Sequence, residues 1–568
     1  MKHFLPLLLP FIWFLNSAAI VPLDHTQNCY YVAHLVSQAD PTNVANTLGL
    51  QYQGQLGELE GHFIFSAPGP CRNTENHDIL SVFNRRPLNS TLLKRDNIPP
   101  TESISFWEPQ VHRKRLSKRI LQADLNKPAP LDKVSEVSKA FNISDPLFSR
   151  QWHLVNNLQI GHDLNVSNVW SQGNFGEGVN VAIVDDGIDH EGKDLAENYF
   201  AEGSYDFNNY QPDPRPQLFD DYHGTRCAGE IAAVRNDMCG VGVAYKAGVA
   251  GIRILGGEVS DADEASALNY QFHQNHIYSC SWGPTDDGVQ MEGPGELIQR
   301  AFLNGVQRGR NKLGSVFVFA SGNGGGNGDN CNFDGYTNSI FSITVGAVDR
   351  LDNHPPYAEL CSAQLIVGYS SGSGDYIHTT DINNKCYDKH SGTSAAAPLA
   401  AGVFALVLSE RPDLTWRDMQ HLCVHSAQPV DEKDPDWVKT AGGFKFNHKY
   451  GFGKLDAYHI VELAKTFKSV KPQAWYESGK VNADAEIPMD HSYTESVFLV
   501  DLDSLKNENF ERLEHVTVTV NIEHPRRGDV IIDLVSPHGT VSNLATSRIH
   551  DGSTQGFQNW TLMSVKHW

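Results

Sequence analysis

Three short motifs carry an aspartate, a histidine and a serine in positions that suit catalysis. IVDDGIDH puts Asp185 at the end of a buried apolar run, HGTRCAGE puts His223 at a helix start, and SGTSAAAP puts Ser394 at a helix N-terminus. A serine hydroxyl is a poor nucleophile at neutral pH, so it needs a histidine to take its proton and a carboxylate to orient that histidine. The three residues together predict nucleophilic catalysis by Ser394.

A fourth motif, FASGNGG, places Asn323 in a glycine-rich loop after an apolar run. Its side-chain amide could donate a hydrogen bond to the oxyanion of a tetrahedral intermediate. Each residue also has an ordinary alternative: Asp185 as a turn cap, His223 as a core histidine, Ser394 as a helix cap and Asn323 as a loop residue. All four in order within one fold favour the catalytic interpretation.

The elements that must position these residues alternate between strands and helices from about residue 145 to 465. Strands are predicted at VNVAIVDDG, AGVAGIRIL, LGSVFVFASGNGG and SITVGAV, and helices begin at GTRCAGEIAAV and SAAAPLAAGVFALVLSE. Buried β-branched strands that alternate with helices are typical of an α/β fold with a parallel sheet. Sites in such sheets lie at the carboxyl ends of the strands, where the quoted motifs fall.

Length, charge and the N-terminus narrow the class of protein. The chain has 568 residues and a formal net charge of -22, which predicts two to four domains and excludes nucleic acid as the main partner. Residues 1–19 predict a secretory signal peptide rather than a membrane anchor, because the apolar run is short and broken by proline. Sequons for N-glycosylation fit that route and occur at Asn89, Asn142, Asn165 and Asn559.

Composition changes along the chain indicate its organisation. Residues 20–119 end in the basic stretch VHRKRLSKRI, which we interpret as a processing site cut after Lys118-Arg119 rather than as a solvated basic face. Residues 120–144 form a linker and residues 145–465 the α/β domain. Residues 472–568 alternate with period two and predict an antiparallel β domain, which we expect to be incomplete because a strand begins near the last residue.

The motifs DDYHGTRCAGE, CSWGPTDDG, FASGNGG, CNFDGYTNSI, SGTSAAAPLAAGV and LTWRDMQHL resemble the kexin and furin family. This family is the branch of the subtilisin-like proteases that cuts after paired basic residues, and the order Asp, His, Ser is that of subtilisin. The resemblance covers nearly the whole chain, and SDPLFSRQWHLVN and HPPYAELCSA are most similar to fungal members. It implies a subtilisin-like catalytic domain, an N-terminal prodomain and a jelly-roll-like C-terminal P domain.

The resemblance also assigns acidic residues to substrate binding, and a buried cationic side chain needs such carboxylate partners. Asp286 and Asp334 match the residues that hold the arginine before the scissile bond. The next basic residue upstream is assigned to Asp186, Asp220 and Asp221. Glu264 and Glu292 match an acidic fourth subsite.

Calcium is the cofactor that the resemblance implies, and it takes six to eight oxygen ligands. Asp145 and Asp194 match one site together with the VRNDMCG loop, in which either Asn236 or Asp237 supplies the side-chain ligand. A second site is implied at Asp286, Asp329 and Glu359.

The cysteines follow the same resemblance. It implies disulfides between Cys239 and Cys386 and between Cys331 and Cys361, and it makes Cys227 a free thiol. Cys29 and Cys71 are candidates for a further pair. Cys280 and Cys423 are interpreted as buried apolar residues.

We therefore expect a calcium-dependent serine endoprotease of the secretory pathway, in the trans-Golgi lumen, that cuts precursor proteins after Lys-Arg or Arg-Arg. Its own prodomain would act as a temporary inhibitor, and any membrane attachment would use a segment outside this chain. The alternatives are a broad-specificity secreted subtilisin and a non-catalytic binding protein that keeps the fold.

Overall fold

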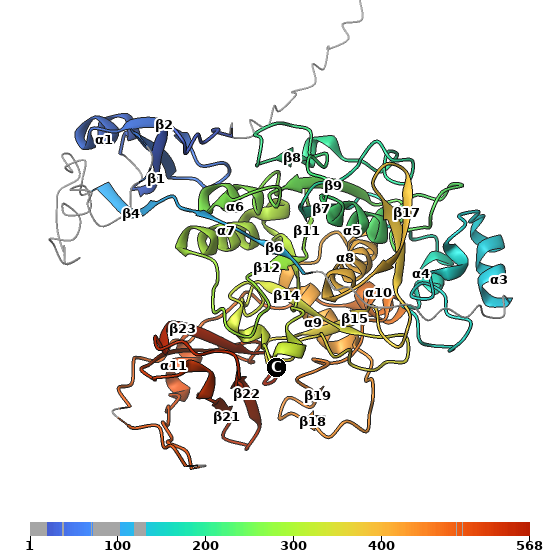
Figure 1. Cartoon of the computed structure of the whole chain (residues 1–568). Coiled ribbons are helices and arrows are strands. Elements are labelled where there is room, and N and C mark those ends of the chain that lie inside the picture. The colour runs from blue at the N-terminus through green and yellow to red at the C-terminus, as the bar shows by residue number, and fades with distance from the viewer. Residues whose placement is uncertain are drawn as a thin grey trace, which may run out of the picture.

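A seven-stranded parallel sheet forms the centre of the protein in the computed structural model, which describes residues 20–36, 39–69, 71, 103–118, 132–483, 485–490 and 492–568 (Figure 1). The strands, in their order across the sheet, are β15 (Ile366–Tyr369), β14 (Ser342–Val348), β13 (Val316–Ala320), β11 (Ile277–Cys280), β7 (Asn180–Asp185), β9 (Gly248–Arg253) and β8 (Tyr205–Asp206). Almost every residue of the five middle strands is buried, which explains their continuous apolar runs. The predicted α/β fold is confirmed.

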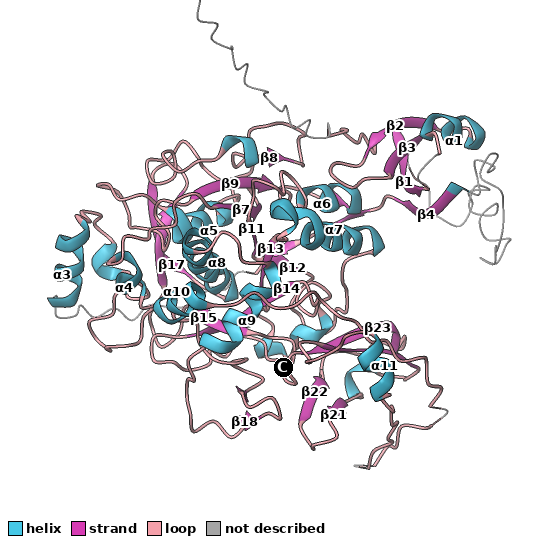
Figure 2. Ribbon diagram, turned by 180° about the vertical axis from the view of Figure 1, so that it is seen from behind, coloured by secondary structure: helices cyan, strands magenta, loops and turns pink. Residues whose placement is uncertain are grey.

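Helices cover both faces of this sheet (Figures 1 and 2). On one face, Phe302 of α7 (Glu296–Lys312) packs against Phe317 and Phe319 of β13, beside α6 (Asp261–Ala267). The opposite face holds α5 (His223–Ala232) and α8 (Thr393–Glu410). Further helices are α3 (Asp132–Phe141), α4 (Val166–Trp170), α9 (Trp416–Ser426) and α10 (Ala457–Thr466).

Helix α8 is apolar around its whole circumference because it runs through the core. It is the one helix in the described part of the chain that is long and apolar enough to cross a membrane, and 89% of that window is buried inside the protein. A helix that is apolar on all sides and buried in this way is typical of the centre of a large domain. We therefore assign α8 to the core.

The N-terminal residues form a separate antiparallel sheet in the order β2 (Gln51–Gln55), β3 (His62–Pro68), β1 (Asn28–Leu35) and β4 (Ile104–Pro109), with helix α1 (Pro41–Leu48). After β4 the chain crosses to the α/β domain. There β5 (His112–Arg113) pairs with β10 (Val259–Ser260), and β6 (Leu116–Ser117) pairs with β12 (Trp282–Gly283) (Figure 1). Residues 112–113 and 116–117, which follow the N-terminal sheet, thus pair with strands of the domain that carries the catalytic motifs.

The C-terminal residues contain two antiparallel strand pairs, as the alternating pattern predicts. β20 (Val516–Ile522) pairs with β23 (Phe557–Ser564), and β21 (Ile532–Val535) pairs with β22 (Val541–Ala545). Helix α11 (Leu502–Asn507) precedes them. Smaller hairpins elsewhere are β16 (Ile377–Asp381) with β17 (Lys385–His390), and β18 (Val438–Lys439) with β19 (Lys445–Phe446). The predicted domain boundaries themselves stay predictions.

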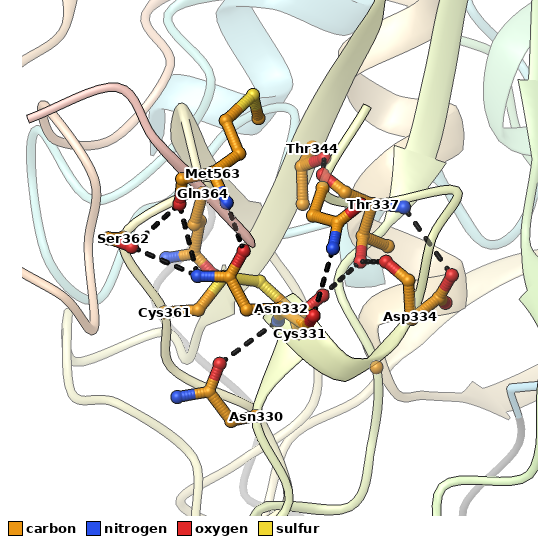
Figure 3. Close-up of a disulfide and its surroundings, with 12 residues drawn as sticks. Asn330, Cys331, Asn332, Asp334, Thr337, Thr344, Cys361, Ser362, Gln364 and Met563 are labelled. Carbon is orange, nitrogen blue, oxygen red and sulfur yellow. Dashed lines mark hydrogen bonds between the residues drawn. A yellow bond between two sulfur atoms is a disulfide. The ribbon is translucent and has the colours of Figure 1, made fainter. Parts of the chain in front are cut away.

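Three disulfides are present among the described residues. Cys239 bonds to Cys386 and Cys331 bonds to Cys361, as expected, and Cys29 bonds to Cys71. The free cysteines are Cys227, Cys280 and Cys423, and all three are buried. Figure 3 shows the Cys331–Cys361 bond, which ties together two loops beside the sheet.

Candidate active site

The end of β7 and the start of α5 bring the predicted aspartate and histidine into contact. His223 Nδ1 lies 2.9 Å from Asp185 Oδ2 and 3.0 Å from Oδ1, and both side chains are buried. The neighbouring Asp186 accepts hydrogen bonds from the backbone N–H groups of His223 and Gly224, at 3.0 and 2.7 Å. A carboxylate on the free N–H groups at a helix start fixes that helix end. Asp185 at the imidazole ring and Asp186 at the backbone N–H therefore both fix the position of His223.

Ser394 stands in the first turn of α8, and its hydroxyl faces the N-terminal segment. Its Oγ donates a hydrogen bond to the carbonyl oxygen of Lys118, and Ser394 is fully buried. Gly392 caps the helix at φ 83°, in the left-handed region, and a Cβ there would lie 3.0 Å from that carbonyl oxygen. Only glycine suits this backbone and leaves room for the carbonyl.

Asn323 is oriented so that its amide nitrogen stays available. Its Oδ1 accepts from Thr393 N at 2.9 Å and from Thr393 Oγ1 at 3.1 Å, while Nδ2 is buried with no hydrogen-bond partner in the described part of the chain. A Cβ on Gly392 would lie 2.9 Å from this nitrogen, so Nδ2 and the Lys118 carbonyl both border Gly392. A buried donor without a partner, close to a carbonyl oxygen that faces Ser394, is what the predicted oxyanion hole requires.

The buried thiol of Cys227 lies beside His223. Its Sγ is 3.9 Å from His223 Nδ1 and 3.8 Å from His390 Nε2, and the three side chains could in principle hold a metal. However, His223 Nδ1 faces Asp185, and His390 Nε2 lies 3.2 Å from Glu230. Burial raises the pKa of the Cys227 thiol well above its usual value. Cys227 is therefore a protonated packing residue and does not compete with Ser394.

Lys118 lies in the pocket predicted to be the first subsite, which we define as Asp286, Asp334 and the carbonyl of Ala320. Lys118 Nζ lies 3.0 Å from Asp334 Oδ2, 3.0 Å from Ala320 O and 4.0 Å from Asp286 Oδ1, and its side chain is 1% exposed. Burial by itself lowers the pKa of Lys118, but the carboxylates of Asp334, Asp286 and Glu359 raise it above the usual value. A buried cation therefore stays charged beside Asp286 and Asp334, and the role of these two residues in substrate binding stays a prediction.

Arg115 lies in another acidic pocket, which is the one predicted at Glu264 and Glu292 to be the fourth subsite. Its Nε lies 3.1 Å from Glu264 Oε2, and one terminal nitrogen lies 2.7 Å from Glu292 Oε1. The other donates to Tyr336 Oη at 2.7 Å, and that hydroxyl donates in turn to Glu264. Tyr336 was not predicted, although it lies in the quoted motif CNFDGYTNSI. Asp261 was also missed, and it lies 3.4 Å from Arg113.

The three aspartates predicted for the second subsite have different surroundings. Asp221 accepts from Arg253 at 2.8 Å and from the backbone N–H groups of Gln217 and Leu218, so its carboxylate is already used inside the protein. Asp186 caps α5, as described above, and Asp220 is exposed. The residue before Lys118 is Ser117, so the bound strand presents no cation at this position. The second-subsite role of these aspartates stays a prediction.

The bound strand lies one residue out of the predicted register. The predicted cut follows Arg119, which lies outside the described residues. The carbonyl at Ser394 belongs to Lys118, whose backbone N–H donates to Ser281 O at 3.1 Å. This register puts a cation into both acidic subsites at once, because Arg115 stands three residues before Lys118.

The first predicted calcium site has a donor set that fits a cation. Asn236 donates from its backbone to Asp145 and from Nδ2 to Asp194 Oδ1 at 3.0 Å, whereas the Asp237 side chain is 83% exposed. Asp194 Oδ2 is buried without a hydrogen-bond partner in the described part of the chain. Burial raises the pKa of Asp145 to about 6 and also raises that of Asp194. Of the two loop candidates, Asn236 is the one at the site.

The second predicted set, Asp286, Asp329 and Glu359, is also buried. Burial raises the pKa of Asp329 to about 6 and that of Glu359 well above its usual value, and neighbouring carboxylates add to both effects. Asp329 Oδ2 accepts from Gly288 N and Glu359 Oε1 from Gly324 N. Like charges buried together are stabilised by a cation, and carboxylate oxygens suit calcium.

The sequons differ in accessibility. Asn142 and Asn559 are exposed, whereas Asn165 is half-buried and its Nδ2 donates to Asp456 at 3.1 Å. Asn89 and the predicted signal peptide lie outside the described residues.

Comparisons with known proteins identify the family of the chain. Residues 176–453 match the Subtilase family, and residues 513–568 match the Proprotein convertase P-domain. The chain is 51% identical over 514 residues to Protease KEX1 of Kluyveromyces lactis, across 90% of this chain and 66% of that protein. It is 45% identical over 566 residues to Kexin of Saccharomyces cerevisiae, across 98% of this chain and 68% of that protein.

Among solved structures, the serine protease of Aeromonas sobria is similar with a TM-score of 0.62 and 25% identity, over 75% of this chain and 86% of that chain. The parallel sheet and the residues at its edge define a subtilase. Within that class, the chain belongs to the kexin family of proprotein convertases. It spans about two thirds of the length of the curated relatives it matches.

Proposed function

We propose that the chain is a serine endoprotease that cuts secretory precursor proteins after basic residues, with paired basic residues such as Lys-Arg as its main target. The observation that carries the proposal is the position of Lys118. Its side chain lies between Asp334 and Asp286, and its carbonyl oxygen accepts a hydrogen bond from Ser394. The pocket proposed to recognise the substrate and the proposed nucleophile, Ser394, therefore both contact Lys118.

Catalysis would begin with attack of Ser394 Oγ on the carbonyl carbon of the residue in the first subsite. His223 takes the hydroxyl proton at Nε2 and later gives it to the leaving amine, while Asp185 holds Nδ1–H and stabilises the imidazolium. Asn323 Nδ2 donates to the oxyanion, and the asparagine in the same role in subtilisin is worth about 2.7–4 kcal/mol of transition-state stabilisation. Water then repeats the sequence on the acyl-enzyme.

The acidic subsites support selectivity for cations. Lys118 and Arg115 are both buried, so each needs its carboxylates. These pairs argue against the broad-specificity alternative. The intact Asp185–His223 pair and the available Asn323 amide argue against a non-catalytic binding protein.

Calcium is the cofactor of the proposal. Asp145, Asp194 and Asn236 would hold one ion, and Asp286, Asp329 and Glu359 a second behind the first subsite. Bound there, calcium would neutralise buried like charges and fix the loops that carry them.

Precursor proteins with dibasic sites are the proposed substrates, and the N-terminal domain is the proposed inhibitor, because its own strand fills the site. The proposed compartment is the secretory pathway, in the trans-Golgi lumen.

Two matched fluorogenic peptides, one ending in Lys-Arg and one in Ala-Arg, test the proposal with and without EDTA. We expect strong preference for Lys-Arg, and loss of cleavage in EDTA that added calcium restores. Equal cleavage of both peptides would favour a general protease, and a serine-reactive phosphonate that fails to label the chain would favour the binding protein.

A further inference from the structure

The two carboxylates of the first subsite come from separate loops, and both loops rest on the C-terminal domain. Asp286 begins the loop 286–290 and Asp334 ends the loop 330–334. Lys118 reaches both, so the subsite works only if the two loops keep a set distance from each other.

Two arginines of the C-terminal domain hold the first loop. Arg548 donates from Nε to Gly288 O at 3.1 Å and from a terminal nitrogen to Gln290 O at 2.8 Å. Arg527 donates to the carbonyl between them, Val289 O, at 2.6 Å. Three consecutive carbonyls that follow Asp286 by two to four residues are thus bound by side chains from another domain.

The side chain of Arg548 is completely buried, and it also lies close to Asp329, Phe333 and Asp551. It lies 3.5 Å from Asp329 Oδ1 and 4.0 Å from the ring centre of Phe333, the residue before Asp334. Asp551 lies 3.7 Å from Arg548 and 2.6 Å from Arg527, so one carboxylate supports both arginines. The rigid guanidinium fork can hold two carbonyls at once, which a lysine ammonium cannot do with the same geometry.

The second loop is held by strand β23. Asn332 Nδ2 donates to Met563 O at 3.0 Å and Met563 N donates to Asn332 Oδ1 at 2.9 Å, next to the Cys331–Cys361 bond (Figure 3). Trp560 Nε1 donates to Asn332 O at 3.0 Å. Phe333 packs into the apolar core of the C-terminal domain, whose buried members are Val530, Leu544, Ala545, Phe557 and Leu562.

We propose that Arg548 is a positioning residue for substrate recognition: it links the loop of Asp286 to the loop of Asp334, so that the C-terminal domain sets the geometry of the first subsite. The inference rests on the proposed function of that subsite. Arg548 contacts neither the substrate strand nor the triad in the described part of the chain, so its effect should fall on selectivity for a cation and spare the reactivity of Ser394.

The experiment measures two properties of the enzyme secreted as the full chain in calcium buffer. The first is the ratio of kcat/KM for two peptides that differ only before the cut, where one has arginine and the other citrulline, its neutral isostere. The second is the rate of inactivation by diisopropyl fluorophosphate, a small reagent that reacts with the serine without a cationic group. The variants are Arg548→Met, Arg548→Lys and Arg527→Lys.

In Arg548→Met we expect the ratio of kcat/KM for the arginine peptide over the citrulline peptide to fall about tenfold, which is the size of a lost hydrogen bond to a charged group. The inactivation rate should stay within about twofold of wild type. The matched control is Arg526→Met, because the Arg526 side chain donates to Asp529 and to the carbonyl oxygen of Ile549, both in its own domain. That control should change neither property.

An unchanged kcat/KM ratio in the Arg548 variants would overturn the inference. An equal loss of that ratio and of the inactivation rate would also overturn it, because Arg548 would then support the fold as a whole. If Arg548→Met is not secreted, the two lysine variants decide by the same criteria. A wild-type enzyme that fails to distinguish arginine from citrulline would instead overturn the proposed function.

Discussion

The hydroxyl of Ser394 donates a hydrogen bond to the carbonyl of Lys118, a residue 276 positions earlier in the chain. Ser394, the proposed nucleophile, therefore faces the protein's own N-terminal segment as it would face a substrate. Arg115 and Lys118 lie on this same N-terminal segment, and each is held in an acidic pocket. The N-terminal segment thus occupies the proposed active site.

Replacing the nucleophile tests self-processing. In Ser394→Ala we expect the N-terminal domain to remain covalently attached, because no hydroxyl can attack the Lys118 carbonyl. Gel mobility and intact mass of the secreted chain would measure this. Prodomain release in the purified variant, with no other protease present, would refute self-processing, and wild-type enzyme added in trans is the control for an accessible cut site.

The register of the bound strand predicts which bond is cut first. With Lys118 in the first subsite, the mature chain should begin at Arg119, and its N-terminal sequence would measure this. Arg115→Leu should slow the release of the prodomain about 10²–10³-fold, because it leaves Glu264 buried without its cation. Leu116→Ala, one residue along and 39% exposed, is the matched control and should have little effect. A mature chain that begins at Ile120, with normal release in Arg115→Leu, would place Arg119 in the subsite instead.

The first subsite predicts selectivity through Asp334. Asp334→Asn keeps Oδ1, which accepts from Tyr336 N at 2.8 Å, but removes the charge that faces Lys118. We expect kcat/KM for peptides with arginine before the cut to fall about 10²–10³-fold. Asp503→Asn is the control, since that side chain is 85% exposed. Equal activity of the two variants would contradict the role of Asp334.

A buried carboxylate between α9 and the C-terminal domain predicts acid sensitivity. Burial would raise the pKa of Glu514, but hydrogen bonds from His421 at 2.9 Å and Arg417 at 3.0 Å lower it to about 2. Because the folded pKa lies below the ordinary value of 4.5, the stabilisation is complete above that pH and is lost as the pH falls toward 2. It amounts to about 3 kcal/mol of the free energy of unfolding at neutral pH.

Urea unfolding of Glu514→Gln measures this contribution. The difference from wild type should be near 3 kcal/mol at pH 7 and shrink below about pH 4. Glu511→Gln is the control, because Glu511 is 61% exposed and pairs with the exposed Lys471. A difference that is constant from pH 7 to pH 3 would show that Glu514 acts by packing and not by charge.

Local sequence was enough to predict the four proposed catalytic residues. Asp185, His223, Asn323 and Ser394 stand at strand ends and helix starts, and such positions are visible in a motif because they depend on a few neighbouring residues. The alternation of buried strands and helices likewise predicted the parallel sheet. The resemblance to a family supplied the disulfides and the acidic subsites, which spacing alone does not reveal.

The tertiary structure alone decided which distant groups meet. It placed Lys118 at Ser394, Tyr336 beside Arg115, Asn236 beside Asp194 and Asp221 beside Arg253. It also brought Arg548 against the loop of Asp286. These contacts depend on how loops and domains pack across hundreds of residues, and the burial that makes each charge pair strong exists only once that packing has formed.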